Sequence, residues 1–184
     1  MQTFPVAAPA TTAVGYSIDA DDVIVAVGGA WHTFAQANGG PVNVVGCSLW
    51  DFVSGRDVEA IWQLLLRHVR GTATPLTFLY RCDAPRVRRL MQMELSPEGR
   101  GGVAFCSRPV AVQKATTFSG DWSGGDLQTV VVCGWCGRVH TDDWVTPDHA
   151  VMQLGLTRPD SSWPALTHGI CASCARQLRG LVRA

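Results

Sequence analysis

The first seventy residues alternate between short apolar runs and turn residues, as in a small domain that mixes strands and helices. Residues 14–18 and 23–27 are two β-type runs separated by an Asp-rich turn, and they predict two strands. Residues 31–37 and 49–52 carry apolar side chains at one-turn helical spacing. Over 56–70 the apolar side chains recur every three or four residues and predict the longest helix. Two strands followed by helices are therefore expected.

Three further strands are predicted after this helix. They cover residues 75–82, 88–95 and 102–115, and turn residues separate them at 83–85 and 96–101. Two strands, several helices and a three-stranded meander fit one five-stranded antiparallel sheet with helices on one face. The fold class predicted from the pattern is therefore α+β.

The composition changes after residue 115. Residues 116–128 are rich in Gly, Ser, Thr and Asp and predict a linker, whereas residues 1–13, with two prolines and many small residues, predict a flexible tail. The expected organisation is thus a tail, a main domain over 14–115, the linker, and a C-terminal module over 129–184. The linker also leads us to expect two separate hydrophobic cores.

Two Cys-x-x-Cys motifs lie in the C-terminal module, CGWC at 133–136 and CASC at 171–174. Two residues between thiolates let one tight turn direct both sulfurs at one ion, and two such turns complete a tetrahedral zinc site. The predicted ligands are Cys133, Cys136, Cys171 and Cys174. The gap between the motifs has room for a helix, predicted over 147–154. A module of this size has a small core, and metal binding would supply the missing stability.

Other uses of these cysteines are open at this point. A single Cys-x-x-Cys pair could be a thioredoxin-like redox centre, but two pairs in one small module favour a metal. An iron–sulfur cluster could use the same four thiolates. His168, three residues before Cys171, could replace a ligand or order the loop. A c-type haem is excluded, because Gly137 and Ala175 stand where that motif needs histidine.

Four stretches in order, YSIDADDVIVAV, WHTFAQANGG, VVGCSLWDFV and RCDAPRVRRLMQMEL, resemble a PAS sensor domain over residues 14–115. With the tail sequences VVCGWCGRVHTDDWV and LTHGICASC, the chain resembles a bacterial group in which a PAS domain precedes a Cys-rich tail. The resemblance implies signal transduction, a ligand pocket between sheet and helices, and a homodimer.

The strand pattern gives a separate reason to expect association. Both alternating sets of side chains in 103–107 include apolar residues, so we expect a second copy or the C-terminal module to cover the outer sheet face.

Cofactor candidates in the main domain are few, and we name no cofactor-binding residue. Light-sensing flavin relatives carry Gly-x-Asn-Cys-Arg-Phe, but Leu49 stands at the cysteine position here and Cys47 directly follows Gly46, so flavin photochemistry is rejected. His68 could ligate haem, although a single histidine on a helix favours a structural role. Cys82 lies among arginines that would activate a thiol, but we favour a hairpin held by Arg–Asp contacts.

Charge and motifs narrow the function. The net charge is zero, and residues 129–184 hold five arginines and four aspartates, so nucleic-acid binding is not expected. No phosphate loop or catalytic motif occurs, and we predict no enzyme. No apolar run is long enough to span a membrane, and the expected location is the cytoplasm. The predicted function is a sensory or adaptor protein in bacterial signalling that acts through ligand- or partner-dependent protein contacts. The alternatives are a zinc-ribbon-like transcriptional regulator and a redox enzyme.

Overall fold

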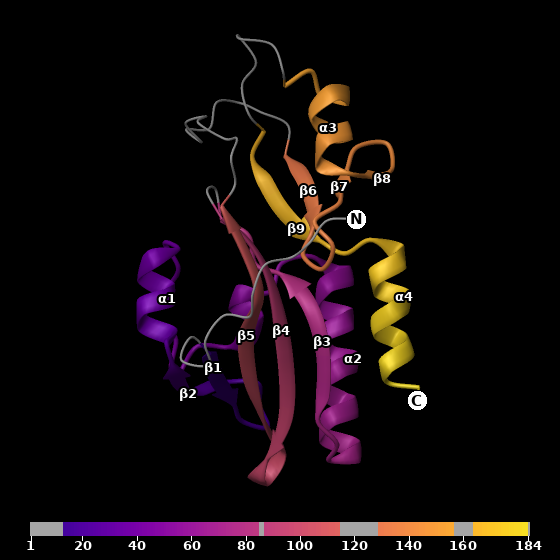
Figure 1. Ribbon diagram of the computed structural model, residues 1–184. Helices are drawn as coiled ribbons and strands as arrows, with labels where there is room; N and C mark the ends of the chain where they lie inside the picture. The colour runs from indigo at the N-terminus through magenta and orange to yellow at the C-terminus, as the bar shows by residue number, and fades with distance from the viewer. Residues whose placement is uncertain (1–12, 85–86, 115–128, 157–163, 184) are drawn as a thin grey trace.

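Five antiparallel strands form the predicted sheet of the main domain (Figure 1). The computed structural model describes residues 13–84, 87–114, 129–156 and 164–183. The strands are β1 (Val14–Ile18), β2 (Ile24–Gly29), β3 (Leu76–Arg81), β4 (Val87–Glu98) and β5 (Gly102–Lys114), in the order β2-β1-β5-β4-β3. The helices are α1 (Trp31–Ala37), the short 3-10 helix η2 (Leu49–Phe52) and α2 (Arg56–Thr72). The predicted α+β fold class, a five-stranded antiparallel sheet with helices on one face and a small C-terminal module, is confirmed.

The helices α1 and α2 pack on one face of this sheet, because one set of alternating strand side chains is apolar. Trp62 of α2 packs against Phe78 of β3 and Phe105 of β5, with ring centroids 5.9 and 5.8 Å apart. The Trp31 ring of α1 packs edge to face on the Tyr16 ring of β1, with the ring centroids 5.6 Å apart. The inner face is thereby closed by aromatic contacts from both helices.

The outer face of the sheet is more polar than the sequence led us to expect. Strand register aligns Thr77, Glu94, Cys106 and Gly15 in one row across four strands, and Glu94 pairs with Arg108 at 4.0 Å. Val103 and Phe105, which suggested an apolar outer surface, lie on the inner face with 0% and 2% of their surface exposed. Apolar side chains of these strands are nevertheless exposed, Leu79 by 51%, Val110 by 40% and Val112 by 46%, so a cover by a second copy or by the C-terminal module stays a prediction.

The C-terminal module has a second sheet, which the sequence did not predict. Strands β6 (Val130–Cys133), β7 (Val139–His140), β8 (Trp144–Val145) and β9 (Leu166–Gly169) pair in the order β8-β7-β6-β9, with β6 and β9 parallel. Helix α3 (Pro147–Gln153) lies between β8 and β9 in the chain, as expected, and α4 (Ala172–Leu181) follows β9.

The C-terminal module, called the C-terminal tail or simply the tail from here on, packs directly on the main domain. Helix α4 lies beside α2, on the side away from the sheet (Figure 1). The Arg81 backbone N–H at the end of edge strand β3 donates to the Gly134 carbonyl at 2.8 Å. One continuous core cluster contains Leu65 of α2 together with Ile170 and Leu178 of the module. The expectation of two separate cores is therefore wrong.

The predicted N-terminal segment 1–13 and the predicted linker 116–128 fall mainly outside the described residues. Only residue 13 of the first is described, and no residue of the second is. The domain boundaries drawn from composition stay a prediction. Among the helices that the structure describes, none combines the length and the apolar character needed to span a membrane.

Candidate metal centre and internal cavity

The first cysteine pair is held by the turn between β6 and β7. Cys133 ends β6, and its N–H donates to the Arg138 carbonyl at 2.7 Å while its own carbonyl accepts from the Gly137 N–H at 2.9 Å. Gly137 has a φ of +75°, a left-handed conformation that favours glycine. This tight turn brings Cys136 back beside Cys133.

The second pair sits where β9 turns into α4. Cys171 is the N-cap of α4, and its Sγ accepts from the Cys174 N–H at 3.4 Å. The Cys171 N–H in turn donates to Cys133 Sγ, also at 3.4 Å. Because β6 and β9 are adjacent parallel strands, the two motifs emerge side by side at the same end of the sheet.

The four sulfurs form one compact group. The ligand atoms of Cys133, Cys136, Cys171 and Cys174 all lie within 4.8 Å of one another. The Cys136 and Cys171 sulfurs are 3.8 Å apart. A tetrahedral ion with Zn–S bonds of about 2.3 Å places its sulfurs ~3.8 Å from each other. The donor set and its spacing therefore fit one tetrahedral zinc ion.

His168 is not part of this group. It lies on β9 and is exposed, and the metal-ligating cluster of the described residues consists of the four cysteines. His140 is likewise elsewhere, with its ring edge to face on Trp144 at 5.1 Å. Four thiolates complete a structural zinc site without a histidine.

The thiols differ in their protonation. Burial raises the pKa of Cys136 to about 11, although the Arg138 N–H partly offsets it. Burial and the neighbouring thiols also raise the pKa of Cys174. At Cys171 burial opposes ionisation, but hydrogen bonds from the Cys174 N–H and from the surrounding thiols outweigh it and lower the pKa. Full deprotonation of the group therefore needs a bound cation.

Trp135 joins the first motif to the main domain. Its ring lies 6.3 Å from Trp62 of α2, and its indole Nε1 is buried with no acceptor among the described residues. Trp62 also contacts the inner sheet face, so the turn that carries Cys133 and Cys136 packs on the core of the main domain.

Cys82 does not have the environment of an activated thiol. Its N–H donates to the Arg89 carbonyl at 3.1 Å, and Arg81 pairs with Asp83 at 2.9 Å in the same hairpin. Burial raises the pKa of Cys82, and Arg89 lowers it by less. The predicted hairpin held by Arg–Asp contacts is confirmed.

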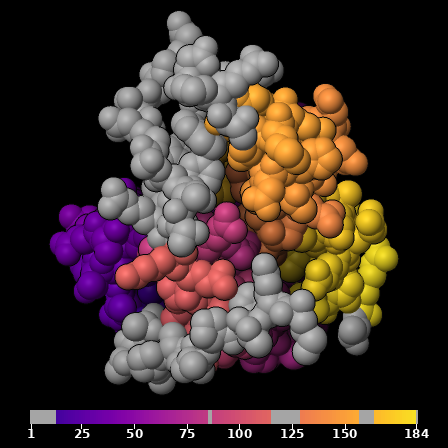
Figure 2. All heavy atoms as spheres, turned by 45° about the horizontal axis from the view of Figure 1, so that its top comes forward, coloured from indigo at the N-terminus to yellow at the C-terminus, as the bar shows by residue number. Residues whose placement is uncertain are grey.

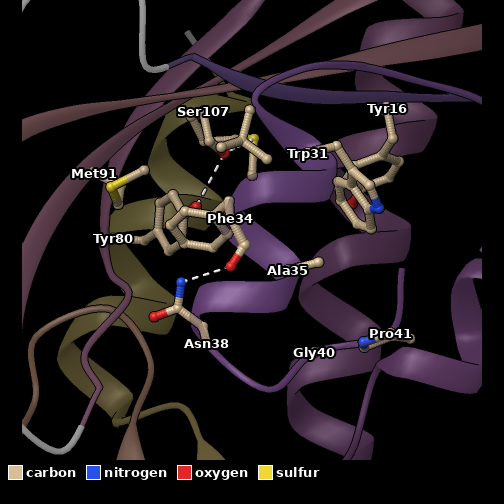
Figure 3. Close-up of a pocket in the computed structure, with 12 residues that line it drawn as sticks. Tyr16, Trp31, Phe34, Ala35, Asn38, Gly40, Pro41, Tyr80, Met91 and Ser107 are labelled. Carbon is tan, nitrogen blue, oxygen red and sulfur yellow. Dashed lines mark hydrogen bonds between the residues drawn. The ribbon is translucent and has the colours of Figure 1, made fainter. Parts of the chain in front are cut away.

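A cavity of about 280 Å³, partly open to solvent, lies between α1 and the sheet (Figure 3). Its lining is mostly apolar, and its polar contacts are made by Tyr80, which donates to Ser107 Oγ at 2.9 Å, and by Asn38, which donates to the Phe34 carbonyl at 2.7 Å. Cys47 and His68, the residues weighed for flavin and haem, do not line it. The lining residues are Val14, Tyr16, Trp31, Phe34, Ala35, Asn38, Gly40, Pro41, Tyr80, Met91, Met93 and Ser107.

Comparison with known proteins gives structural likenesses only. No protein-family model and no curated protein matches the chain. A domain of an HTR-like protein from Haloarcula marismortui matches at 13% identity and a TM-score of 0.40, over 54% of this chain and 99% of that one. An RNA-binding Light-Oxygen-Voltage receptor matches at 16% identity and a TM-score of 0.38, over 54% of this chain and 28% of that one. Both TM-scores are too low to carry an argument about function.

Proposed function

We propose that this protein is a sensory or adaptor protein, in which a metal-bound tail and a PAS-like domain act together through contacts with a signalling partner. The observation that carries the proposal is the position of α2, which packs on the inner sheet face through Trp62 and on the tail through Trp135 and α4. A change in packing on one side of α2 shifts the packing on its other side, because close-packed protein interiors transmit strain.

The signal enters, on this proposal, as a small ligand in the cavity beside α1. A volume of about 280 Å³ lies at the lower end of the range for small-molecule pockets, so the ligand is small. The apolar lining suits an apolar body, and the paired Tyr80 and Ser107 hydroxyls suit one polar group.

Zinc is the metal that best suits the tail. Four thiolates bind zinc as a closed structural site, and the metal then supplies folding energy to the module. An iron–sulfur cluster is the alternative for the same ligands, but it separates its thiolates around several ions, whereas these sulfurs lie within 4.8 Å of one another.

The remaining elements of the proposal follow from the resemblance to bacterial PAS proteins. They are a homodimer and a protein partner as output. A cytoplasmic location and the lack of catalytic activity complete the proposal, and they are motivated by the sequence patterns described above.

One observation favours the alternative function, a zinc-ribbon-like nucleic-acid-binding regulator. Arg176 and Arg179 in the second half of α4 and Arg183 just beyond its end are exposed with helical spacing, which places three cations together. The aspartates of the module balance them in number, so we place this function second.

Metal analysis and an absorption spectrum of the purified chain test the proposal together. We expect about one zinc per chain and no visible absorption. A brown protein would assign the four cysteines to an iron–sulfur cluster. A flavin or haem spectrum would overturn the small-ligand assignment of the cavity.

A further inference from the structure

A groove of about 500 Å³ runs between the tail and the β3–β4 hairpin. Figure 2 shows orange residues of the tail beside the magenta end of β3 and start of β4. The groove is separate from the cavity beside α1, because the two share no lining residue. One wall comes from the hairpin, and the other walls come from the tail sheet, α3 and the chain around them. A ligand in this groove would therefore touch both parts of the chain.

The tail contributes a mostly aliphatic surface. Its branched side chains come from the tail sheet and from α3, such as Val132, Leu166 and Val151. None of the described lining residues is Phe, Tyr or Trp, whereas four such residues line the cavity beside α1. Aromatic rings favour flat ligands that stack on them, and aliphatic side chains have no such preference. The lining of the groove therefore suits a flexible alkyl chain.

The hairpin contributes the charged wall. Arg81, Asp83 and Arg88 line this wall and together carry an excess of one positive charge. Asp83 is already engaged, since its carboxylate pairs with Arg81 at 2.9 Å and accepts from the Arg89 N–H at 2.7 Å. Arg88 is exposed and takes part in none of the ion pairs formed among the described residues. The groove thus presents one uncompensated guanidinium beside an aliphatic surface.

We propose that this groove binds an aliphatic monocarboxylate, such as decanoate, with its carboxylate on Arg88 and its alkyl chain against the tail. A planar guanidinium binds a carboxylate through two parallel hydrogen bonds. One excess positive charge matches a monoanion, whereas the dianion of a phosphate monoester would leave a charge unpaired. Each CH2 group that leaves water strengthens binding about fourfold.

Such a ligand would stabilise the contact between the tail and the main domain. The groove has both walls only while the tail is docked on the hairpin, so a ligand that needs both walls favours the docked arrangement. The same contact includes the hydrogen bond from the Arg81 N–H to the Gly134 carbonyl and the packing of Trp135 on Trp62. This site goes beyond the proposed function, since it is a second ligand site outside the cavity beside α1.

Calorimetric titration of the purified full chain tests the site. The probes are decanoate, octanoate and decan-1-ol, each below the concentration at which it aggregates. We expect one decanoate per chain, bound about tenfold more tightly than octanoate because two more CH2 groups are buried. Decan-1-ol has the same chain without the charge and should bind about tenfold more weakly than decanoate, the loss of one charge-assisted hydrogen bond.

Two pairs of variants locate the site. Arg88→Glu should weaken decanoate binding at least about tenfold and leave decan-1-ol nearly unchanged. Arg67→Glu makes the same charge change at an exposed position of α2 outside the groove, and it should leave both probes nearly unchanged. Val151→Phe fills the groove and should weaken both probes about tenfold. Met152→Phe is its control, because Met152 is 66% exposed and does not line the groove.

Three results would overturn the carboxylate site: no binding of decanoate, equal affinity for decanoate and decan-1-ol, or equal effects of the groove variants and their controls. Circular dichroism and metal content verify that every variant is folded and loaded like the parent chain. A chain without zinc that still binds decanoate through Arg88 would refute the metal assignment and leave the carboxylate site in place.

Discussion

Truncating one side chain of the tail tests whether the chain has one core or two. Leu178 of α4 is 3% exposed and belongs to the same core cluster as Leu65 and Leu66 of α2. Replacing a buried leucine by alanine costs ~3 kcal/mol, from lost burial and from the cavity left behind. If the tail and main domain share a core, Leu178→Ala lowers the free energy of unfolding of the whole chain by that amount.

Urea unfolding measures this change. For a chain of this size the dependence of unfolding free energy on urea is ~2 kcal/mol per molar, so the loss moves the midpoint down by ~1.5 M. Far-UV circular dichroism follows both sheets, and the fluorescence of the seven tryptophans, Trp62 and Trp135 among them, follows tertiary packing. We expect both signals to move together. Met152→Ala is the control, since Met152 is 66% exposed and its truncation should leave the midpoint nearly unchanged.

Two separate transitions would refute this reasoning. If Leu178→Ala shifted an early transition while the main change in circular dichroism stayed at its original urea concentration, the sheet of the main domain would be independent of α4. The core cluster would then describe a contact between two units rather than one cooperative structure.

Three further predictions concern the cavity, nucleic acid and association. Burial raises the pKa of Tyr80 to about 12, so between pH 10 and pH 12 the folded state keeps a proton that the unfolded state loses. The contribution of this group to stability is full below pH 10 and falls toward pH 12. In urea titrations, Tyr80→Phe should make that fall less steep. Duplex DNA should bind no better than to a neutral control protein at physiological salt; a steep salt dependence that disappears in Arg176→Gln/Arg179→Gln would instead support the nucleic-acid alternative. A homodimer, predicted from the resemblance alone, should appear by light scattering at micromolar concentration, and a monomer there would exclude it.

The main domain could be predicted from sequence because its elements are individually well marked. The apolar stripe from Val58 to Val69 identifies α2, and the Asp-rich turn before Val23 separates β1 from β2. Sequence did not reveal which alternating set faces inward in β5, since Ala104 and Cys106 looked as apolar as Val103 and Phe105. Strand register decides that question by placing Cys106 beside Glu94.

The grouping of the four cysteines could be predicted from the sequence, and the structure around them could not. Within each Cys-x-x-Cys motif, the positions of the two sulfurs depend on one local turn, and the motif itself largely specifies that turn. The strands β7 and β8 have two residues each, too short for any periodic signal. The docking of α4 on α2 depends on side chains more than 100 residues apart in the chain, such as Leu65 and Leu178, and no local pattern records such a contact.

The docking of the tail changes what metal binding can do. With separate cores, a bound ion would stabilise the C-terminal module alone. Removing the ion would then affect the main domain only through the chain segment that connects the two. Ile170 and the buried Cys133 and Cys171 share one core cluster with α2, so a ligand that binds only the native arrangement of the four cysteines stabilises that whole core. The same linkage works in reverse, because a ligand that favours one packing of α2 changes the affinity of the cysteines for the metal by an equal factor. The cavity beside α1 and the candidate metal centre can thus influence one another through packing alone, since Trp62 contacts the inner sheet face on one side and Trp135 on the other.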